Sequence, residues 1–402
     1  MTNLPQDWEW KSLGEILSND KYSIKRGPFG SALKKSFFVE NGIRVFEQYN
    51  AINNDPHWKR YFISYDKFKE LEAFKAIEGD LLISCSGTLG KIVELPKHTE
   101  IGIINQALLK IRLDNTKILN SYFIYNFNSP IMQGKILEST LGSAIKNIAS
   151  VKILKQIKIP LPPLKEQERI VGILDESFAK IDESIKILEQ DLLNLDELMQ
   201  SALQKAFNPL KDNAKENYKL PQSWEWKSLE EISENISAGG DKPKNCTESK
   251  TAKNQIPVYA NGVNNNGLVG YTDKATIIKP SLTISARGTI GFVCIRKEPY
   301  FPIVRLISLI PCENILCLHY LYFCLNFFIA KGEGSSIPQL TIPKFKSLQI
   351  PLPPLKEQEQ IAEHLDFVFE KAKALKELYT KELKDYEELK QSLLDKAFKG
   401  EL

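Results

Sequence analysis

Two long stretches of the chain place apolar residues three and four positions apart, and this spacing predicts two long helices. The first, a central helix within residues 161–207, follows Pro162-Pro163 and contains a single glycine. We expect it to end at Phe207, because proline stands two positions later and cannot continue a helix. The second lies within residues 352–402 and also follows a double proline.

The apolar positions of both helices follow a heptad, the pattern of helices that pack side by side along a seam. The seam positions expected in the first helix are Val171, Leu174, Phe178, Ile181, Ile185, Leu188, Leu192 and Leu195. Those expected in the second are Leu365, Ala372, Tyr379, Leu383, Tyr386 and Leu393, in a less regular row. At about 1.5 Å per residue the first helix would be roughly 65 Å long. Because this exceeds the width of a small domain, each helix is expected to bury its apolar stripe against the other.

The remaining segments predict mixed α/β domains. Short strand-like runs occur at Leu81–Ser84, Ile277-Ile278 and Phe292–Ile295, separated by clusters of glycine, asparagine and proline. Helical patterns occur near Tyr65–Phe74 and Leu318–Ile329. The pattern alone does not predict the order of strands in a sheet.

Four motifs occur twice, which indicates a tandem repeat. The pairs are residues 4–13 with 220–229, 159–168 with 350–359, 205–207 with 396–398 and, more weakly, 84–90 with 285–291. These repeats divide the chain into a first globular domain at 1–160, the central helix at 161–207, a linker at 208–215, a second globular domain at 216–351 and a C-terminal helix at 352–402. The interiors of the two globular domains differ far more than the motifs at their edges.

Composition adds a charge distribution that the net charge of +3 conceals. The globular segments 1–160 and 208–351 carry +6 and +5, whereas the helical segments 161–207 and 352–402 carry −5 and −3. Positive domains joined by negative helices suit a protein whose domains meet a polyanion. The six cysteines form no metal-ligand or disulfide spacing, so no metal site is expected. No secretion signal or membrane span is expected either, which favours a cytoplasmic location.

Loops of both domains carry side chains suited to DNA. Arginine pairs with guanine, asparagine with adenine, and lysine with phosphate. The candidates in the first domain are Lys25, Arg26, Ser31, Lys34, Lys35, Ser86, Thr88 and Lys91. Those in the second are Lys242, Lys244, Asn261, Asn264, Asn265, Arg287, Thr289 and Arg305. Asn-Gly runs are also typical of tight turns, and that interpretation stays open for their backbone.

Motifs for catalysis are absent from the sequence. Both double prolines stand in Leu-Pro-Pro-Leu, which lacks the polar residue that an amino-methyltransferase needs to hold its target amine. The glycines of residues 87–92 are too close together for a phosphate-binding loop, and Ile92 stands where a hydroxyl is needed. The four histidines lie far apart. We therefore expect a chain without catalytic residues or a bound cofactor.

The repeated motifs resemble those of the specificity subunits of type I restriction–modification systems, over essentially the whole chain. The resemblance lies in the Leu-Pro-x-x-Trp-Glu-Trp opening, in Pro-Leu-Pro-Pro-Leu-Lys-Glu-Gln-Glu, in Ser285–Gly291 and in Pro302–Leu306. The first half departs from it. Cys85-Ser86 stands in place of Ala286-Arg287, and Asn105-Gln106 lies where Val304-Arg305 is expected. This difference suggests that the two domains read different DNA sequences.

The resemblance implies two α/β target-recognition domains in tandem, separated by two long antiparallel coiled-coil helices and related by a pseudo-two-fold repeat. Each domain would read one half of a bipartite, gapped site in double-stranded DNA. The helices would set the gap and dock two modification (methyltransferase) subunits, with restriction subunits completing the complex. S-adenosylmethionine, ATP and Mg²⁺ are expected on those partners and none on this chain.

Two other functions remain open at this point. One is a coiled-coil adaptor that binds proteins rather than DNA. The other is the recognition part of a fused methyltransferase–nuclease, against which the missing cofactor motifs argue.

Overall fold

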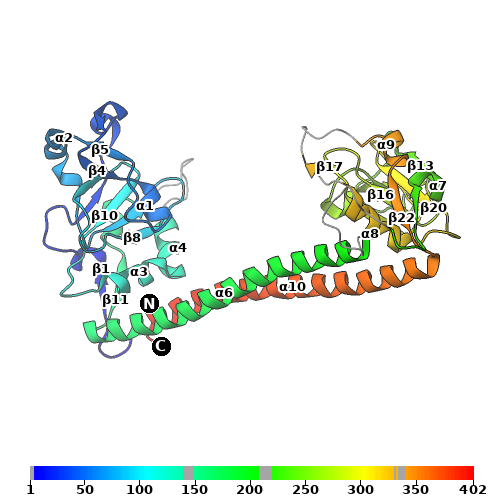
Figure 1. Cartoon of the computed structure of the whole chain (residues 1–402). Helices are drawn as coiled ribbons and strands as arrows, with labels where there is room; N and C mark the ends of the chain where they lie inside the picture. The colour runs from blue at the N-terminus through cyan, green and yellow to red at the C-terminus, as the bar shows by residue number, and fades with distance from the viewer. Residues whose placement is uncertain (1–3, 139–147, 208–219, 330–331, 334–339) are drawn as a thin grey trace. The chain divides into compact units, whose positions relative to one another are not determined.

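The computed structural model describes residues 4–138, 148–207, 220–329, 332–333 and 340–402 (Figure 1). The chain divides into two compact units, and the division falls inside both long helices. The first unit contains residues 1–187 and 381–402, and the second contains residues 188–380. The predicted linker at 208–215 lies outside the described residues.

The two long helices are α6 (Leu164–Phe207) and α10 (Leu355–Lys399). Each begins directly after a double proline, whose second carbonyl accepts bonds from the first free N–H groups of the helix. Asp182 pairs with Lys390 in the first unit, and Asp196 pairs with Lys376 in the second. Arg169 also donates to the Leu402 carbonyl in the first unit, and Leu203 shares a core with Ala362 in the second. Within each unit the partner number falls as the α6 number rises, so the helices run antiparallel there.

The predicted seam positions differ in burial. The buried ones are Leu174, Ile181, Leu188, Leu195, Leu365 and Ala372. Those that stay partly exposed are Val171, Phe178, Ile185, Leu192, Tyr379, Leu383, Tyr386 and Leu393. On α10, Leu375 and Leu389 are exposed although they continue the apolar pattern, so the seam is less regular on this helix.

The described residues of the first unit form three sheets. β1 (Glu9–Ser12) pairs with β11 (Lys158–Leu161). A four-stranded sheet has the order β2 (Ile24–Arg26), β10 (Leu108–Ile111), β7 (Leu81–Ser84) and β8 (Ile92–Glu94). A five-stranded sheet has the order β3 (Phe38–Val39), β5 (Tyr61–Ile63), β4 (Ile43–Phe46), β9 (Gly102–Ile104) and β6 (Lys75–Ala76). Its helices are α1 (Gln48–Ile52), α2 (Tyr65–Glu70), α3 (Asn120–Asn128), α4 (Pro130–Glu138) and α5 (Val151–Leu154).

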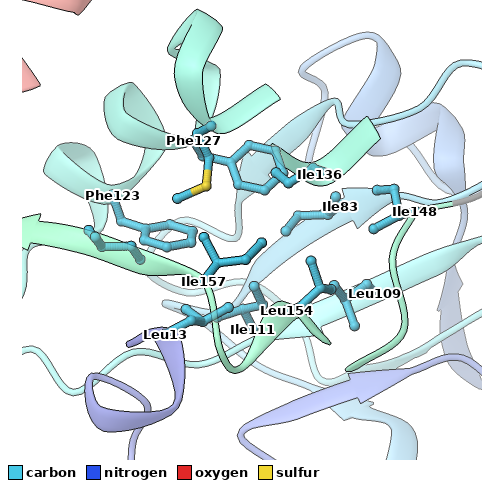
Figure 2. A pocket seen from close by; sticks show the side chains of 12 residues that line it. Leu13, Ile83, Leu109, Ile111, Phe123, Phe127, Ile136, Ile148, Leu154 and Ile157 are labelled. Atoms are coloured by element: carbon cyan, nitrogen blue, oxygen red, sulfur yellow. The ribbon is translucent and has the colours of Figure 1, made fainter. Parts of the chain in front are cut away.

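The four-stranded sheet of the first unit is buried on both faces. Ile83 points to the core formed with α3 and the ends of the long helices, and its neighbour Leu82 points to the core shared with the five-stranded sheet. This alternation follows from the two-residue period of a strand. Figure 2 shows the first core, where Phe123 and Phe127 of α3 face Leu109 around a cavity of about 10 Å³. A space this small and apolar holds no water.

The second unit repeats part of this plan. β12 (Glu225–Ser228) pairs with β22 (Gln349–Leu352), and a four-stranded sheet has the order β13 (Ser233–Ala238), β20 (Ile307–Pro311), β16 (Ser281–Ile284) and β18 (Val293–Arg296). β15 (Leu268–Thr272), β14 (Ile256–Tyr259) and β19 (Phe301–Pro302) form a three-stranded sheet, and β17 (Thr289–Ile290) pairs with β21 (Gly332–Glu333). The helices are α7 (Leu229–Ile232), α8 (Leu318–Phe328) and α9 (Ile342–Lys346). The predicted strand at Ile277-Ile278 is wrong, because Ile277 forms only an isolated bridge and Ile278 is 71% exposed.

A buried glutamine joins each long helix to its globular domain. The Gln167 side chain accepts a bond from the Leu119 N–H at 2.9 Å and donates to the carbonyls of Lys117 and Pro162. Gln358 makes the corresponding bonds to Cys317, Ile315 and Pro353. These are the glutamines of the repeated Leu-Lys-Glu-Gln motif, so the repeat preserves the joint between helix and domain.

Each globular domain is completed by the end of the other repeat's helix. Phe398, at the end of α10, packs on Tyr122 of the first unit with ring centroids 5.3 Å apart. Phe207, at the end of α6, packs on Tyr320 of the second unit at 5.5 Å. Both phenylalanines are buried in the main core of the unit they join. The repeated Lys-Ala-Phe motif is therefore an exchanged core segment.

Phe398→Ala should destabilise the first unit although residue 398 follows the second globular domain in sequence. Removing a buried phenylalanine costs about 3–5 kcal/mol through lost burial and the cavity left behind. Phe207→Ala should have the same effect on the second unit. Hydrogen–deuterium exchange should localise faster exchange to residues 118–127 in the first variant and to residues 316–328 in the second. The opposite assignment would contradict the exchange of helix ends.

Candidate nucleic-acid interface

Three loops meet at one end of the four-stranded sheet in the first unit. Strand pairing places Leu109 beside both Arg26 and Ile83. The chain therefore leaves β2, enters β10 and leaves β7 at the same end of the sheet. The Arg26 guanidinium donates to the Cys85 carbonyl, and the Cys85 N–H donates to the Ala107 carbonyl at 2.8 Å. The segments after β2, before β10 and after β7 are thereby tied into one surface.

A glycine is required where two of these loops cross. The Gly27 N–H donates to the Leu108 carbonyl at 2.9 Å, and a Cβ at position 27 would lie 1.8 Å from the Asn105 oxygen. Any side chain there would push the loops apart. The glycine beside the basic pair Lys25-Arg26 therefore serves close packing, which the sequence pattern did not predict.

The structure brings some of the candidates of the first domain together. The Arg26 guanidinium lies 5.6 Å from the ring of Phe29, which is 68% exposed, and Ser86, Thr88 and Lys91 follow in the loop between β7 and β8. Lys25 points instead toward the rings of Tyr22 and Phe74. Ser31, Lys34 and Lys35 are exposed farther along the chain, beside Ala32 and Leu33, which pack on the five-stranded sheet.

The weakest of the repeated motifs has the same backbone in both domains. The Ser84 N–H donates to the carbonyl of Lys91, and its carbonyl accepts from Gly90; Ser285 makes the corresponding bonds with Phe292 and Gly291. The glycines at the third position after these serines, Gly87 and Gly288, have φ of 67° and 70°. The loop is therefore one structure carrying different side chains, Ser86 in the first domain and Arg287 in the second, and Arg287 is exposed.

The hydrogen bonds around the turns before β10 and β20 show which residues of the two domains correspond, and one predicted pairing is wrong. Gly27 bonds to the Leu108 carbonyl as Gly239 bonds to the Leu306 carbonyl, so Leu108 corresponds to Leu306. Val304-Arg305 then corresponds to Gln106-Ala107, one position later than the predicted Asn105-Gln106. The sequence places this correspondence one residue too early because the two turns have no motif in common. Only the hydrogen bonds to Leu108 and Leu306 show which residues match.

Asn261 connects the loops of the second domain. Its side-chain N–H donates to the Val304 carbonyl at 2.7 Å, and its oxygen accepts from the Ala286 N–H at 2.8 Å. In the first domain the corresponding segments are joined directly, by the bond from the Cys85 N–H to the Ala107 carbonyl. In the second domain the Asn261 side chain lies between them. Asn261 is one of the candidates for DNA contact in the sequence, and in the structure its amide positions the loops that carry Arg287 and Arg305.

Left-handed backbone conformations concentrate in this surface. Val304 and Arg305 have φ of 52° and 60°, and Asn265 and Asn266 have 47° and 52°. For residues other than glycine this conformation costs about 1–2 kcal/mol each, most for a β-branched residue such as valine. Such strain persists where surrounding contacts impose it, and it gathers at functional sites.

The other candidates of the second domain lie on or near these loops. Asn264 and Asn265 are exposed in the turn after Asn261, and Thr289 is half-buried in β17. Lys242 and Lys244 are exposed just after Gly239-Gly240, whose carbonyls accept from Arg305 and Val304.

Arg296 is a supporting residue that the sequence pattern did not reveal. Its guanidinium lies 3.6 Å from the centre of the Tyr259 ring and donates to the Thr283 hydroxyl and to the Asn266 carbonyl. It is 8% exposed. A buried arginine that holds the left-handed asparagine turn has no period or motif, so only the structure could identify it.

The segment after β13 carries Asp241 beside Lys242 and Lys244, whereas six other segments of these surfaces contain no acidic residue. In the first domain these are residues 21–39, 81–93 and 101–113, and in the second residues 256–272, 279–297 and 299–312. Carboxylates of other segments pair with two of their basic residues, Arg112 with Asp20 and Asp80, and Lys279 with Glu234. A surface of this composition attracts a polyanion such as nucleic acid.

The cysteines and other potential metal ligands form no cluster among the described residues. Burial raises the pKa of the Cys85 thiol to about 11, so it stays protonated at neutral pH. All six cysteines are free, and no cluster of three potential metal-binding side chains occurs among residues with a described position. Over the same residues, no helix is both long and apolar enough to cross a membrane.

Comparison with known families agrees with the repeat. The family model for the type I restriction modification DNA specificity domain matches residues 5–192 and again residues 221–384. The chain belongs to this family. It is thus a tandem pair of specificity domains, each match covering one globular domain and most of one long helix.

Individual relatives extend the comparison. A Mycoplasma pneumoniae protein assigned as a type I specificity subunit is 33% identical over 221 residues, covering 54% of this chain and 56% of that protein. The match therefore spans only about half the length of that relative. A solved chain from a study of complex assembly and conformational transition of the type I R-M system has a TM-score of 0.81, with full coverage of both chains and 20% identity. The HsdS subunit from Thermoanaerobacter tengcongensis has a TM-score of 0.65 at 20% identity, covering 100% of this chain and 98% of that one. Both share the fold of this specificity-domain protein.

Asn261→Ala should destabilise the second specificity domain by about 1–3 kcal/mol, because it leaves the Ala286 N–H and the Val304 carbonyl without their partner. Asn264→Ala, an exposed change three residues away, should alter stability by less than about 0.5 kcal/mol. Urea unfolding followed by circular dichroism compares the two. Equal stability of both variants would show that Asn261 does not connect the loops.

Lys110 should make the stability of the first unit rise with pH. It is 2% exposed and donates to the Lys75 carbonyl at 2.6 Å, with Asp80, Asp20 and Arg112 also nearby; burial lowers its pKa to about 8. The folded state thus releases this proton before the unfolded state, whose lysine titrates near 10.5. The free energy of unfolding of the native protein should therefore increase relative to Lys110→Met between pH 7 and pH 10. A flat or falling difference would contradict the shifted pKa.

Proposed function

We propose that this chain reads double-stranded DNA for a type I restriction–modification complex, each specificity domain contacting one half of a bipartite, gapped site. The observation that carries the proposal is the pair of loop surfaces. They have the same strand order and the same serine-loop backbone in both domains. Yet Ser86 stands where the second domain has Arg287, and Gln106-Ala107 stands where it has Val304-Arg305. A shared frame with different exposed side chains suits two readers of unlike sequences.

The two surfaces have the chemistry that such reading needs. Exposed lysines supply contacts to phosphate that do not depend on sequence, whereas arginine and amide side chains on braced loops supply contacts to base edges. Three segments in each domain contain no acidic residue, which reduces repulsion of a phosphate backbone. The braced left-handed turns limit the ordering that binding would otherwise require.

Catalysis in this proposal belongs to partner subunits. Two modification subunits, which would bind S-adenosylmethionine and methylate adenine, would dock on the long helices, and restriction subunits using ATP and Mg²⁺ would join them. This chain would bind none of these cofactors and would carry out no reaction. The assembly would act in the cytoplasm, where its DNA lies and where free thiols are stable.

Arg287→Ala should weaken recognition of one half-site only. With the modification subunits co-expressed in a host without other adenine methylation, mapping of methylated adenines should reveal a bipartite sequence for the native chain. Loss of one bidentate base contact should reduce discrimination at one base pair of the second half-site by about ten- to a hundredfold. The first half-site should be unchanged.

The control is Lys297→Ala, which removes an exposed charge at the opposite end of the same sheet. It should leave both half-sites unaltered. A native chain that directs no bipartite methylation would contradict the proposed function. A native methylation pattern in Arg287→Ala with lowered thermal stability would assign Arg287 a structural role instead.

A further inference from the structure

The turn before β10 in the first domain and the turn before β20 in the second are held by matching hydrogen bonds. A hydrogen bond closes each turn, from Leu108 N–H to the Asn105 carbonyl at 3.1 Å and from Leu306 N–H to the Ile303 carbonyl at 3.0 Å. A glycine backbone, Gly27 or Gly239, bonds to the residue that follows each turn. Both glycines cross the turn so closely that a Cβ would overlap its backbone. These hydrogen bonds fix the backbone of each turn without using the side chain of Gln106 or Arg305, which stays available for another role.

The side chains on the two turns differ in chemistry. In the first domain Gln106 is exposed, while Ala107 is tied down because its carbonyl accepts from Cys85. In the second domain the turn is left-handed, and both Val304 and Arg305 are exposed. The exposed polar side chain stands at the first central position in the first domain, as Gln106, and at the second central position in the second domain, as Arg305. Each turn therefore presents one polar side chain to solvent.

The second turn keeps its strained conformation because four hydrogen bonds enclose it. The N–H groups of Val304 and Arg305 donate to Gly240 and Gly239 at 2.8 and 2.9 Å, and the Asn261 amide donates to the Val304 carbonyl. The turn-closing bond to Leu306 is the fourth. No core contact requires this conformation of Arg305, since its side chain faces solvent. Arg305 thus has a backbone fixed in a strained, left-handed conformation and a guanidinium that faces solvent. A polar side chain on such a fixed backbone is suited to binding a ligand.

We propose that Gln106 and Arg305 are specificity-determining residues, Gln106 pairing with an adenine of the first half-site and Arg305 with a guanine of the second. The inference rests on the proposed DNA-reading function. A glutamine amide offers one donor and one acceptor, which match N7 and N6 of adenine. A guanidinium offers two parallel donors, which match O6 and N7 of guanine. Each turn also lies beside the loop of its own domain that carries Ser86 or Arg287.

The test exchanges the two side chains and reads the recognised sequence. The native chain and its variants are co-expressed with the modification subunits, and methylated adenines are mapped across the genome. Arg305→Gln should change one G·C pair of the second half-site to A·T and leave the first half-site intact. Gln106→Arg should make the reciprocal change in the first half-site. In each case the relative preference for the two base pairs should shift by about ten- to a hundredfold.

Matched controls change the charge by the same amount elsewhere in each domain. Lys297→Gln removes an exposed charge at the far end of the second domain's sheet, and Gln156→Arg adds one on an exposed residue between α5 and β11. Neither should alter a half-site. If the controls reproduced the sequence change, total charge rather than a base contact would be responsible and the inference would be overturned.

Conservative variants cover the case in which an exchanged protein directs no methylation. Arg305→Lys keeps the charge without the guanidinium fork, and Gln106→Met keeps the length without the amide. Each should still direct methylation and lose discrimination at a single base pair. Unaltered discrimination in these variants, or unaltered half-sites in the exchanged ones, would overturn the inference and leave the DNA-reading function in place. Absence of bipartite methylation with the native chain would instead overturn that function.

Discussion

Two phenylalanines, Phe207 and Phe398, set the organisation of the molecule. Each lies in the last turn of a long helix and is buried in the core of the unit built mainly by the other repeat, against Tyr320 or Tyr122. A buried aromatic side chain of this size contributes several kcal/mol, a large part of the stability of one domain. Within each unit, the end of a helix from one repeat thus completes a core built mainly by the other repeat. The seam itself is less regular, since Leu375 and Leu389 of α10 stay exposed.

The repeat preserves structure and varies chemistry at different places. Gln167 and Gln358 make matching sets of bonds at the joint between helix and domain, and the serine loops after β7 and β16 share their backbone. Side chains at the end of the four-stranded sheets differ, and so do the sheets packed beside them, five strands in one domain and three in the other. A frame defined by backbone bonds allows this, because substitutions on its loops leave those bonds intact.

The sequence predicted the long helices, the tandem repeat and the α/β class, because these depend on periodicity, proline and repeated motifs. Phe207 is the last residue of α6, as the proline at position 209 indicated. The interface was harder to predict. Asn261 is joined to Val304 and Ala286 by contacts across 43 and 25 residues of sequence, and Arg296 supports a turn 30 residues away. Such contacts follow from the order of strands in the sheet, which no local pattern encodes, and for the same reason the turn at Gln106 was placed one residue too early.

The exchange of helix ends also has a consequence for the order in which the protein can fold during synthesis. The second unit is one continuous segment, residues 188–380, and can assemble as soon as that segment has left the ribosome. The first unit needs residues 381–402 to complete its core, although its globular part is synthesised first. Until then Tyr122 and the neighbouring apolar side chains lack the phenylalanine that covers them. The first domain to be made is thus the last to be finished, and its incomplete core stays exposed to the cell for as long as the second domain takes to be translated.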